Sequence, residues 1–201
     1  LVDGRYVAFV SMATDLLSSP TTAIRQVYVR DLATDTTSLV SAGYSGGAGG
    51  NSSDEPSISA DGRYVAFSSY AANLLASATS GQQVFRRDLA GGTTVLVSEA
   101  GDGDGGGDST SRQPVISPDG AHVVFSSMAT DLVTGYSFDG NWQVFLRDIA
   151  GSLTRVVSVD SDEALANSES GGYGSGLSSE GRYVSFNSSA SNLVADDTNY
   201  S

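Results

Sequence analysis

The sequence predicts an all-β fold built of repeated four-stranded antiparallel sheets, and three observations support this. A segment over residues 57–67 returns almost letter for letter, and its acidic residue-glycine pair recurs at spacings of 58, 58 and 61 residues. Two further strand-like segments follow each copy, and Gly- and Ser-rich stretches join the copies. A fixed period of this length is typical of solenoids, propellers and arrays. Four-stranded sheets repeated radially describe a β-propeller, and about three and a half such blades are present in the 201 residues.

The first two strands of each unit are predicted to form a hairpin. In the second unit, Ser57-Ile58-Ser59 meets a tight turn at Asp61-Gly62, and Tyr64-Val65-Ala66-Phe67 follows. Glycine adopts positive φ without steric cost, and aspartate can bond the turn backbone. Because the second strand is apolar at consecutive positions, we expect a sheet that is covered on both faces. The other copies of the hairpin are Val2–Phe9, Ile116–Phe125 and Leu177–Phe186.

The third and fourth strands of each unit follow a variable connection. This connection repeats a Ser-x-Ala-x-Asp/Asn-Leu pattern, which we interpret as a turn whose Asp or Asn side chain bonds local backbone. Long polar stretches after the fourth strand are interpreted as loops that cross to the next unit. Third strands are predicted at 26–32, 83–89 and 143–149, fourth strands at 37–41, 94–98 and 154–158, and crossing loops at 42–55, 99–113 and 159–176.

These elements divide a single propeller segment, residues 1–201, into four units at 1–55, 56–113, 114–174 and 175–201. The first unit lacks one strand and the fourth lacks two. Closed propellers have about four to eight blades, and an open arc would expose apolar sheet faces. We therefore expect completion, either because the chain is a segment of a longer propeller or because open arcs self-associate. The truncated ends favour the first possibility.

Composition excludes several classes of function. The formal charge is −13, and all ten basic residues other than the lone histidine are arginines. Such a surface repels nucleic acid and anionic lipid, so we expect no nucleic-acid partner. No apolar run approaches the ~18 residues of a membrane helix, which predicts no membrane insertion. The absence of cysteine rules out disulfides and thiol catalysis within these residues.

Three segments carry a resemblance to a known family: the Ser-Ala-Asp-Gly-Arg-Tyr-Val-Ala-Phe-Ser-Ser core at 59–69, the Val-Phe-x-Arg-Asp-Leu strand at 84–89, and the segment at 192–199. They resemble the TolB-like, WD-repeat-like propeller repeats of bacterial envelope and secreted proteins. The resemblance covers nearly the whole chain and implies an extracytoplasmic location, whether secreted, at the cell surface or in the periplasm. It implies little about activity, because the family is used in binding scaffolds, transport-associated proteins and domains attached to enzymes.

Candidate catalytic groups are few. The lone histidine, His122, is interpreted as a strand-surface substitution at the position of Arg5, Arg63 and Arg182, rather than as a catalytic base. An Arg-Asp pair recurs in each complete third strand, for example Arg87-Asp88. Because a catalytic group is needed once and a blade-to-blade bond is needed in every blade, we expect these pairs to join blades. We therefore expect no enzymatic activity from these residues.

One acidic loop is a candidate Ca²⁺ site. Asp102, Asp104 and Asp108 lie in a flexible Gly-rich stretch, and oxygen-rich loops of this kind suit Ca²⁺. The alternative is a solvated acidic loop, because the twelfth position is Gln113 and not the Glu of an EF-hand. Weaker candidates are Asp196, Asp197 and Asn199, and the Asp139-Gly140-Asn141 segment.

Three aromatic residues, Tyr136, Phe138 and Trp142, cluster in the longest connection between a second and a third strand. Exposed aromatics among Gly, Ser and Asn suit contact with a glycan or a protein. They could equally fold back over a blade edge.

Together these features predict a non-catalytic extracytoplasmic scaffold whose loops bind a protein, a glycan or Ca²⁺, or whose open arcs self-associate. The alternative is the propeller portion of a secreted hydrolase or lyase with its catalytic residues outside this segment. A third possibility is a structural assembly protein in which exposed sheet faces join copies end to end.

Overall fold

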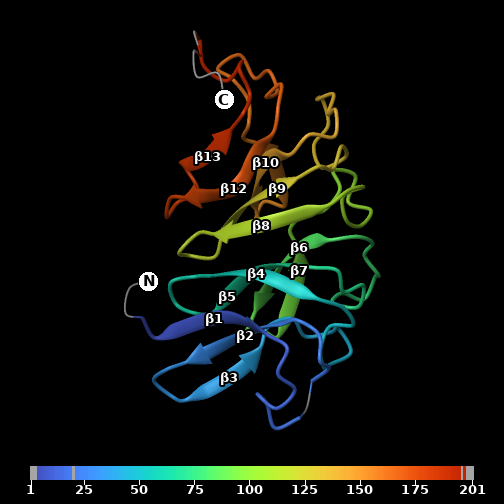
Figure 1. The fold of residues 1–201 in the computed structure, drawn as a ribbon, viewed down its shortest axis with the longest axis vertical. Helices are drawn as coiled ribbons and strands as arrows, with labels where there is room; N and C mark the ends of the chain where they lie inside the picture. Colours follow the sequence, from blue (N-terminus) through green and yellow to red (C-terminus); the bar gives the residue numbers. More distant parts are fainter. Residues whose placement is uncertain (1–3, 20, 196, 198–201) are drawn as a thin grey trace.

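The computed structural model describes residues 4–19, 21–195 and 197. In this part of the chain there are thirteen β-strands and no helix, hence no helix long and apolar enough to cross a membrane. The strands form four sheets. Figure 1 shows the sheets following one another along the long axis of the molecule, from the N-terminal sheet in blue to the C-terminal sheet in red.

All strand pairs are antiparallel, and each sheet keeps its strands in chain order. The first sheet contains β1 (Tyr6–Ser11), β2 (Gln26–Asp31) and β3 (Thr36–Leu39). The second contains β4 (Ser53–Ile58), β5 (Tyr64–Ser69), β6 (Gln83–Asp88) and β7 (Thr93–Leu96). The third contains β8 (Ser111–Ile116), β9 (His122–Ser127), β10 (Gln143–Asp148) and β11 (Leu153–Val156). The fourth contains β12 (Ser170–Leu177) and β13 (Val184–Ser188).

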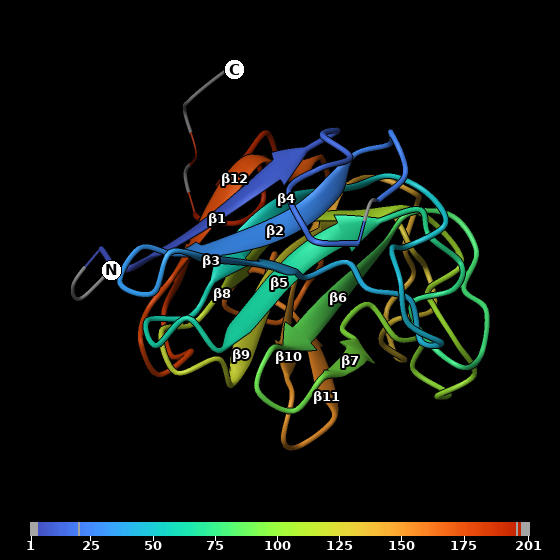
Figure 2. The same cartoon turned by 90° about the horizontal axis from the view of Figure 1, so that it is seen from below.

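The core lies between neighbouring sheets, which stack face to face (Figure 2). We call the contact of the first and second sheets the first interface, and the contact of the second and third sheets the second interface. Val65 and Phe67 of β5 are fully buried in the first interface, whereas Ala66 between them is buried in the second. This arrangement confirms the expectation of a sheet covered on both faces. A stacked Phe pair spans β5 and β6 of the second sheet, with ring centroids 5.9 Å apart.

The innermost strands begin inside stretches that the sequence analysis interpreted as crossing loops, so that interpretation is wrong at its C-terminal end. β4 starts at Ser53 and β8 at Ser111. Both strands are polar and irregular, with a register shift in each, so no alternation of apolar residues marks them. Glu55 and Gln113 hold φ of 55° at these bulges, and the Glu55 carboxylate accepts the Gln113 backbone N–H at 2.8 Å.

The Asp-Gly turns pack against an aromatic ring of the preceding sheet. Gly120 has φ of +75°, and a Cβ there would overlap the ring of Tyr64. Gly181 meets His122 in the same way. His122 therefore occupies the position of the tyrosine, and Ala121 that of the arginine, which corrects the alignment used in the sequence analysis. The His122 imidazole packs against the turn at Gly181, as the Tyr64 ring packs against the turn at Gly120.

The Ser-x-Ala-x-Asp/Asn-Leu connections bond a different segment from the one expected. The Asn73 side chain accepts the backbone N–H of Gly50 at 2.7 Å, and the Asp131 carboxylate accepts that of Asp108 at 3.0 Å. These partners lie in the loop that enters the same sheet, not in local backbone. The leucine that follows is buried, as at Leu74. The repeated segment therefore fastens each crossing loop to its sheet.

A buried glutamine begins the third strand of each of the first three units. Gln83 accepts the Ser98 hydroxyl at 2.6 Å and donates to the carbonyl of Gly107 at 2.9 Å. The Ser98 hydroxyl in turn accepts the backbone N–H of Val84 at 2.9 Å. Gln26 and Gln143 form the corresponding bonds. These networks satisfy polar groups that would otherwise be costly to bury.

Candidate functional site

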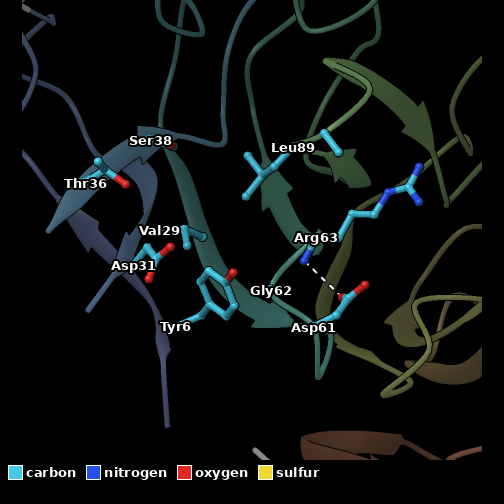
Figure 3. Close-up of a pocket in the computed structure, with 10 residues that line it drawn as sticks. Tyr6, Val29, Asp31, Thr36, Ser38, Asp61, Gly62, Arg63 and Leu89 are labelled. Carbon is cyan, nitrogen blue, oxygen red and sulfur yellow. Dashed lines mark hydrogen bonds between the residues drawn. The ribbon is translucent and has the colours of Figure 1, made fainter. Parts of the chain in front are cut away.

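A pocket of about 320 Å³ opens at the first interface, and Figure 3 shows its lining. It lies where the hairpin turn of the second sheet faces the third and fourth strands of the blade before it. The first sheet supplies Tyr6, Val29, Asp31, Thr36 and Ser38, and the second supplies Asp61, Gly62, Arg63, Leu89 and Ala90.

The pocket exists because one position of the repeat varies. Val29 in β2 corresponds to Arg86 in β6 and to Leu146 in β10. At the second interface the Arg86 guanidinium lies 4.4 Å from the centroid of the Tyr64 ring, and its Nη1 donates to the carbonyl of Gly120 at 2.7 Å. The shorter side chain of Val29 cannot reach that far. A smaller pocket of about 140 Å³ is lined by Leu146 and His122, between the third sheet and the turn at Gly181.

The charged groups around the pocket are already engaged. Arg5 donates Nε and Nη2 to the two carboxylate oxygens of Asp31, at 2.8 and 2.6 Å. This ion pair holds the pKa of Asp31 well below its ordinary value. Arg63 binds Asp88 in the same two-pronged manner, which raises the pKa of Arg63 and lowers that of Asp88 to about 2. These groups stay ionised at neutral pH and are held in fixed geometry.

The turn carboxylate is also committed to structure. Asp61 accepts the Ser59 hydroxyl at 2.6 Å and the Arg63 backbone N–H at 3.0 Å, the bond drawn dashed in Figure 3. Asp119 makes the same bonds with Ser117 and Ala121, and they lower its pKa. The pocket thus offers an exposed polar rim with paired charges beside the ring of Tyr6.

The recurring Arg-Asp pairs do not join blades in the way the sequence analysis expected. The aspartate of each pair, in the first two sheets, binds the arginine that directly precedes the neighbouring strand of its own sheet, as Asp88 binds Arg63 before β5. The arginine of the pair mostly stays within its sheet as well, as Arg30 does with Asp35. Arg147 is the exception among the described pairs, because its ion pair with Glu99 crosses the second interface.

In the acidic loop, the carboxylates of Asp102 and Asp108 have separate structural roles. The Asp102 carboxylate accepts the backbone N–H of Asp104 at 2.9 Å. The Asp108 carboxylate accepts both the backbone N–H and the hydroxyl of Thr130, at 2.7 and 2.6 Å. Across residues 4–19, 21–195 and 197, no group of three or more His, Cys, Asp or Glu side chains could hold a metal ion. Ca²⁺ binding by this loop stays a prediction, and no cluster of ligand side chains among the described residues supports it.

The weaker metal candidates fare similarly. Asp196 and Asn199 lie outside the described residues, and Asp197 alone of that group lies inside them. In the other segment, Asp139 binds Asn141, accepting its side-chain amide at 2.7 Å and its backbone N–H at 3.1 Å. This is a local turn bond.

The three predicted binding aromatics are half-buried and make intramolecular contacts. Tyr136 and Phe138 have ring centroids 5.9 Å apart, and Phe138 contacts the buried Phe145 at 5.7 Å. The Arg112 guanidinium lies 3.9 Å from the centroid of the Trp142 ring. Both arrangements fold the aromatics over the third sheet. A role in ligand contact stays a prediction.

Sequence reasoning missed the pocket at the first interface. The sequence analysis considered the residues that recur in every unit, whereas the pocket depends on Val29, at a position that varies between units. The signal was present in the third strands, where the residue after the aromatic is valine, arginine and leucine in turn.

Comparison with known proteins identifies the fold. No protein-family model matches the sequence, and no curated protein matches it. Among solved structures, the chain is similar to a putative TolB from Agrobacterium tumefaciens, with 17% identity and a TM-score of 0.51 over 92% of this chain and 55% of that one. It is also similar to the tricorn protease, with 10% identity and a TM-score of 0.53 over 92% of this chain and 14% of that one. The chain thus spans about half the length of the TolB structure.

At these identities the likeness concerns architecture. The chain is a partial β-propeller of TolB-like fold, with two four-stranded blades flanked by a three-stranded and a two-stranded sheet.

Proposed function

We propose that this chain is part of a non-catalytic β-propeller scaffold that acts outside the cytoplasm and binds a segment of a protein partner in the pocket of Figure 3. The observation that carries the proposal is the single divergence at Val29. The charged groups that line this pocket are used for ion pairs and turns, and the residue at the position of Val29 sets whether this inter-blade space is open or filled.

The form of the pocket supports a polypeptide ligand. Its rim is polar but its carboxylates and guanidinium are already paired, so binding a second charge there would compete with bidentate ion pairs. β3, which contributes Thr36 and Ser38, is bonded to β2 alone among the described strands. Such an edge can pair with an extended peptide segment, while the pocket receives a side chain. The charge of −13 favours a partner with a basic surface.

A photo-crosslinking experiment tests this proposal. A photoreactive residue at Thr36 in the full chain should capture a defined partner from the cell envelope. Val29→Arg should abolish the adduct, because the new guanidinium can stack on Tyr6 as Arg86 does on Tyr64. Leu146→Arg, which fills the equivalent position of the third sheet, is the matched control and should leave the adduct intact.

An adduct that survives Val29→Arg, or that Leu146→Arg removes equally, would overturn the proposed site. Protease protection of the chain in intact cells, with cleavage only after the outer barrier is opened, tests the extracytoplasmic location. The alternative role, as the propeller portion of a secreted hydrolase or lyase, predicts a catalytic domain in the same polypeptide. That role would be supported if hydrolytic or lyase activity copurified with the full protein and depended on residues outside 1–201.

A further inference from the structure

The arginine before the aspartate in each third strand makes one constant bond. Nη1 of Arg30, Arg87 and Arg147 donates to a threonine hydroxyl on the neighbouring outer strand, at 3.2, 3.0 and 3.0 Å. The three guanidinium groups are therefore held in the same place in their sheets. What differs between them is the partner of the second terminal nitrogen, Nη2.

Two of the three arginines find a carboxylate of this chain for Nη2. Arg30 binds Asp35 in the turn of its own sheet, at 2.7 Å. Arg147 binds Glu99, which comes from the crossing loop that leaves the preceding sheet. These are two independent routes by which the fold supplies an anion to the same guanidinium position.

Arg87 has neither route. Gly92 stands at the turn position of Asp35, and Ala42 stands at the crossing-loop position of Glu99, where both residues form the same kind of bridge within the loop. Among the described residues Arg87 forms no ion pair within 4.0 Å, and its Nε is buried without a hydrogen-bond partner. Burial accordingly lowers the pKa of the Arg87 guanidinium, since its lost hydration is not fully replaced.

A pocket of about 400 Å³ lies beside Arg87. The equivalent pocket at the second interface, of about 410 Å³, is lined by both Glu99 and Arg147, so what distinguishes the Arg87 pocket is that no carboxylate of the described residues lines it. Ala42, Gly92 and Arg87 all line it, and so does Thr94, the residue that accepts from Arg87. Tyr44 stands at its rim with 69% of its surface exposed. Arg87 does not line the pocket of Figure 3, so this site is separate from the proposed partner site.

We propose that the Arg87 pocket binds a carboxylate ligand, which takes the place that Asp35 and Glu99 take beside Arg30 and Arg147. An arginine fixed by one hydrogen bond, with a free Nη2 and a pocket of ligand size, is suited to a charge-assisted bond with a carboxylate oxygen. The ring of Tyr44 offers a surface for an apolar group attached to that carboxylate. The ligand is either a small organic acid or an acidic side chain of a protein.

The test follows the Arg87 Nε–Hε resonance in the full chain, labelled with ¹⁵N-arginine, during titration. The probes are sodium benzoate and the blocked peptide N-acetyl-Gly-Glu-Gly-amide, each against sodium chloride at equal ionic strength. We expect a saturable shift of the Arg87 resonance. Ala42→Glu and Gly92→Asp each install an internal carboxylate, and each should weaken binding about tenfold or more. Thr34→Glu adds the same charge in an exposed turn and should leave binding unchanged.

Two filling variants are used because either one could perturb the fold, and each copies a residue that a sister sheet already carries. A shift with benzoate alone supports an organic acid, and a shift with the peptide supports an acidic side chain. The proposal is overturned if neither probe shifts the Arg87 resonance saturably. It is also overturned if Ala42→Glu and Gly92→Asp, both folded, bind as the unaltered chain does.

Discussion

The first and second interfaces are built from the same repeat, yet Arg86 fills a space at the second interface that Val29 leaves open at the first. Each interface contains a stacked pair of phenylalanine rings, and in each a turn glycine packs against a tyrosine ring. Two of the positions at which they differ bear on binding. Arg86 closes the second interface where Val29 leaves the first open, and Glu99 neutralises Arg147 where Ala42 leaves Arg87 without an acid.

The difference shows how a repeated scaffold acquires binding capacity. The residues that hold sheets together recur, so they fix the position of every backbone segment around the interface. Residues at the rim then vary without cost to the core. A binding site at one interface therefore requires only a shorter side chain, as at Val29, or an uncharged one, as at Ala42, at a position where the sister interface carries Arg86 or Glu99.

The largest effect should come from the shared core, where the two interfaces are expected to behave alike. Phe67→Ala and Phe125→Ala each remove a fully buried ring, and each should lower the free energy of unfolding by about 3–5 kcal/mol. Phe9→Ala, at the same position of the half-buried β1, should cost less. Urea denaturation measures all three. A Phe67→Ala effect well below that of Phe125→Ala would mean that the first interface is loosely packed, and the comparison would fail.

The turn glycines provide the next test. Gly120→Ala forces a Cβ into the Tyr64 ring at φ of +75°, and should cost about 3 kcal/mol from strain and overpacking together. Gly4 has φ of +68°, but a Cβ added there would meet no atom of the described residues within 4 Å, so Gly4→Ala should cost about 1 kcal/mol. The difference between the two variants in thermal and urea unfolding isolates the inter-sheet contact. Equal losses of unfolding free energy in the two variants would show that the Tyr64 ring moves aside at little energetic cost.

Removing Glu99 from the second interface should leave Arg147 without an ion pair among the described residues, as Arg87 is at the first interface. Glu99→Ala leaves the buried Arg147 without its carboxylate and should cost about 2–4 kcal/mol of unfolding free energy. The same change should create a benzoate-induced shift at Arg147 like the one expected at Arg87. Asp104→Ala removes an equal charge from an exposed turn and serves as the control. No loss of stability would mean that the Arg147–Glu99 pair contributes nothing beyond its desolvation.

Much of the fold could be predicted from the sequence, because the features that determine it recur. The Asp-Gly turns, the apolar second strands and the number of sheets followed from residues such as Gly62 and Phe67, whose physical roles are local and repeated. The inner strands β4 and β8 could not be predicted in full. Their polar residues and bulges at Glu55 and Gln113 carry no periodic pattern, and contacts with neighbouring sheets hold them.

The candidate sites were harder to predict for a related physical reason. From the sequence, the loop aspartates were candidate metal ligands. In the structure the Asp108 carboxylate accepts hydrogen bonds from Thr130, 22 residues further along the chain, a contact that sequence spacing does not reveal. The role of His122 depended on aligning it correctly with Tyr64. The pocket of Figure 3 depends on the short side chain of Val29, and among the described residues Arg87 lacks an ion pair because Ala42 stands at the position of Glu99. Each of these absences becomes visible only when the sister residues are seen in contact.

The smallest effect concerns the half-exposed ion pair between Arg63 and Asp88. Asp88→Asn should cost about 1 kcal/mol at neutral pH, because the pair is bidentate but partly solvated. The folded-state pKa of Asp88 lies at about 2, below its ordinary value of 3.8, so the ionised form is the one that folding stabilises. The contribution is therefore complete above the ordinary value and is lost as the pH falls from there through about 2.

Urea unfolding across this acidic range should show the gap in stability between Asp88→Asn and the unaltered chain closing as the pH falls. Asp148→Asn is the matched control, because Ala121 stands where Arg63 stands and no ion pair of Asp148 occurs within 4.0 Å in the described residues. A gap that stays constant would mean that the Asp88→Asn change lowers stability through the turn bonds to Ala90 and Gly91 and not through the lost charge.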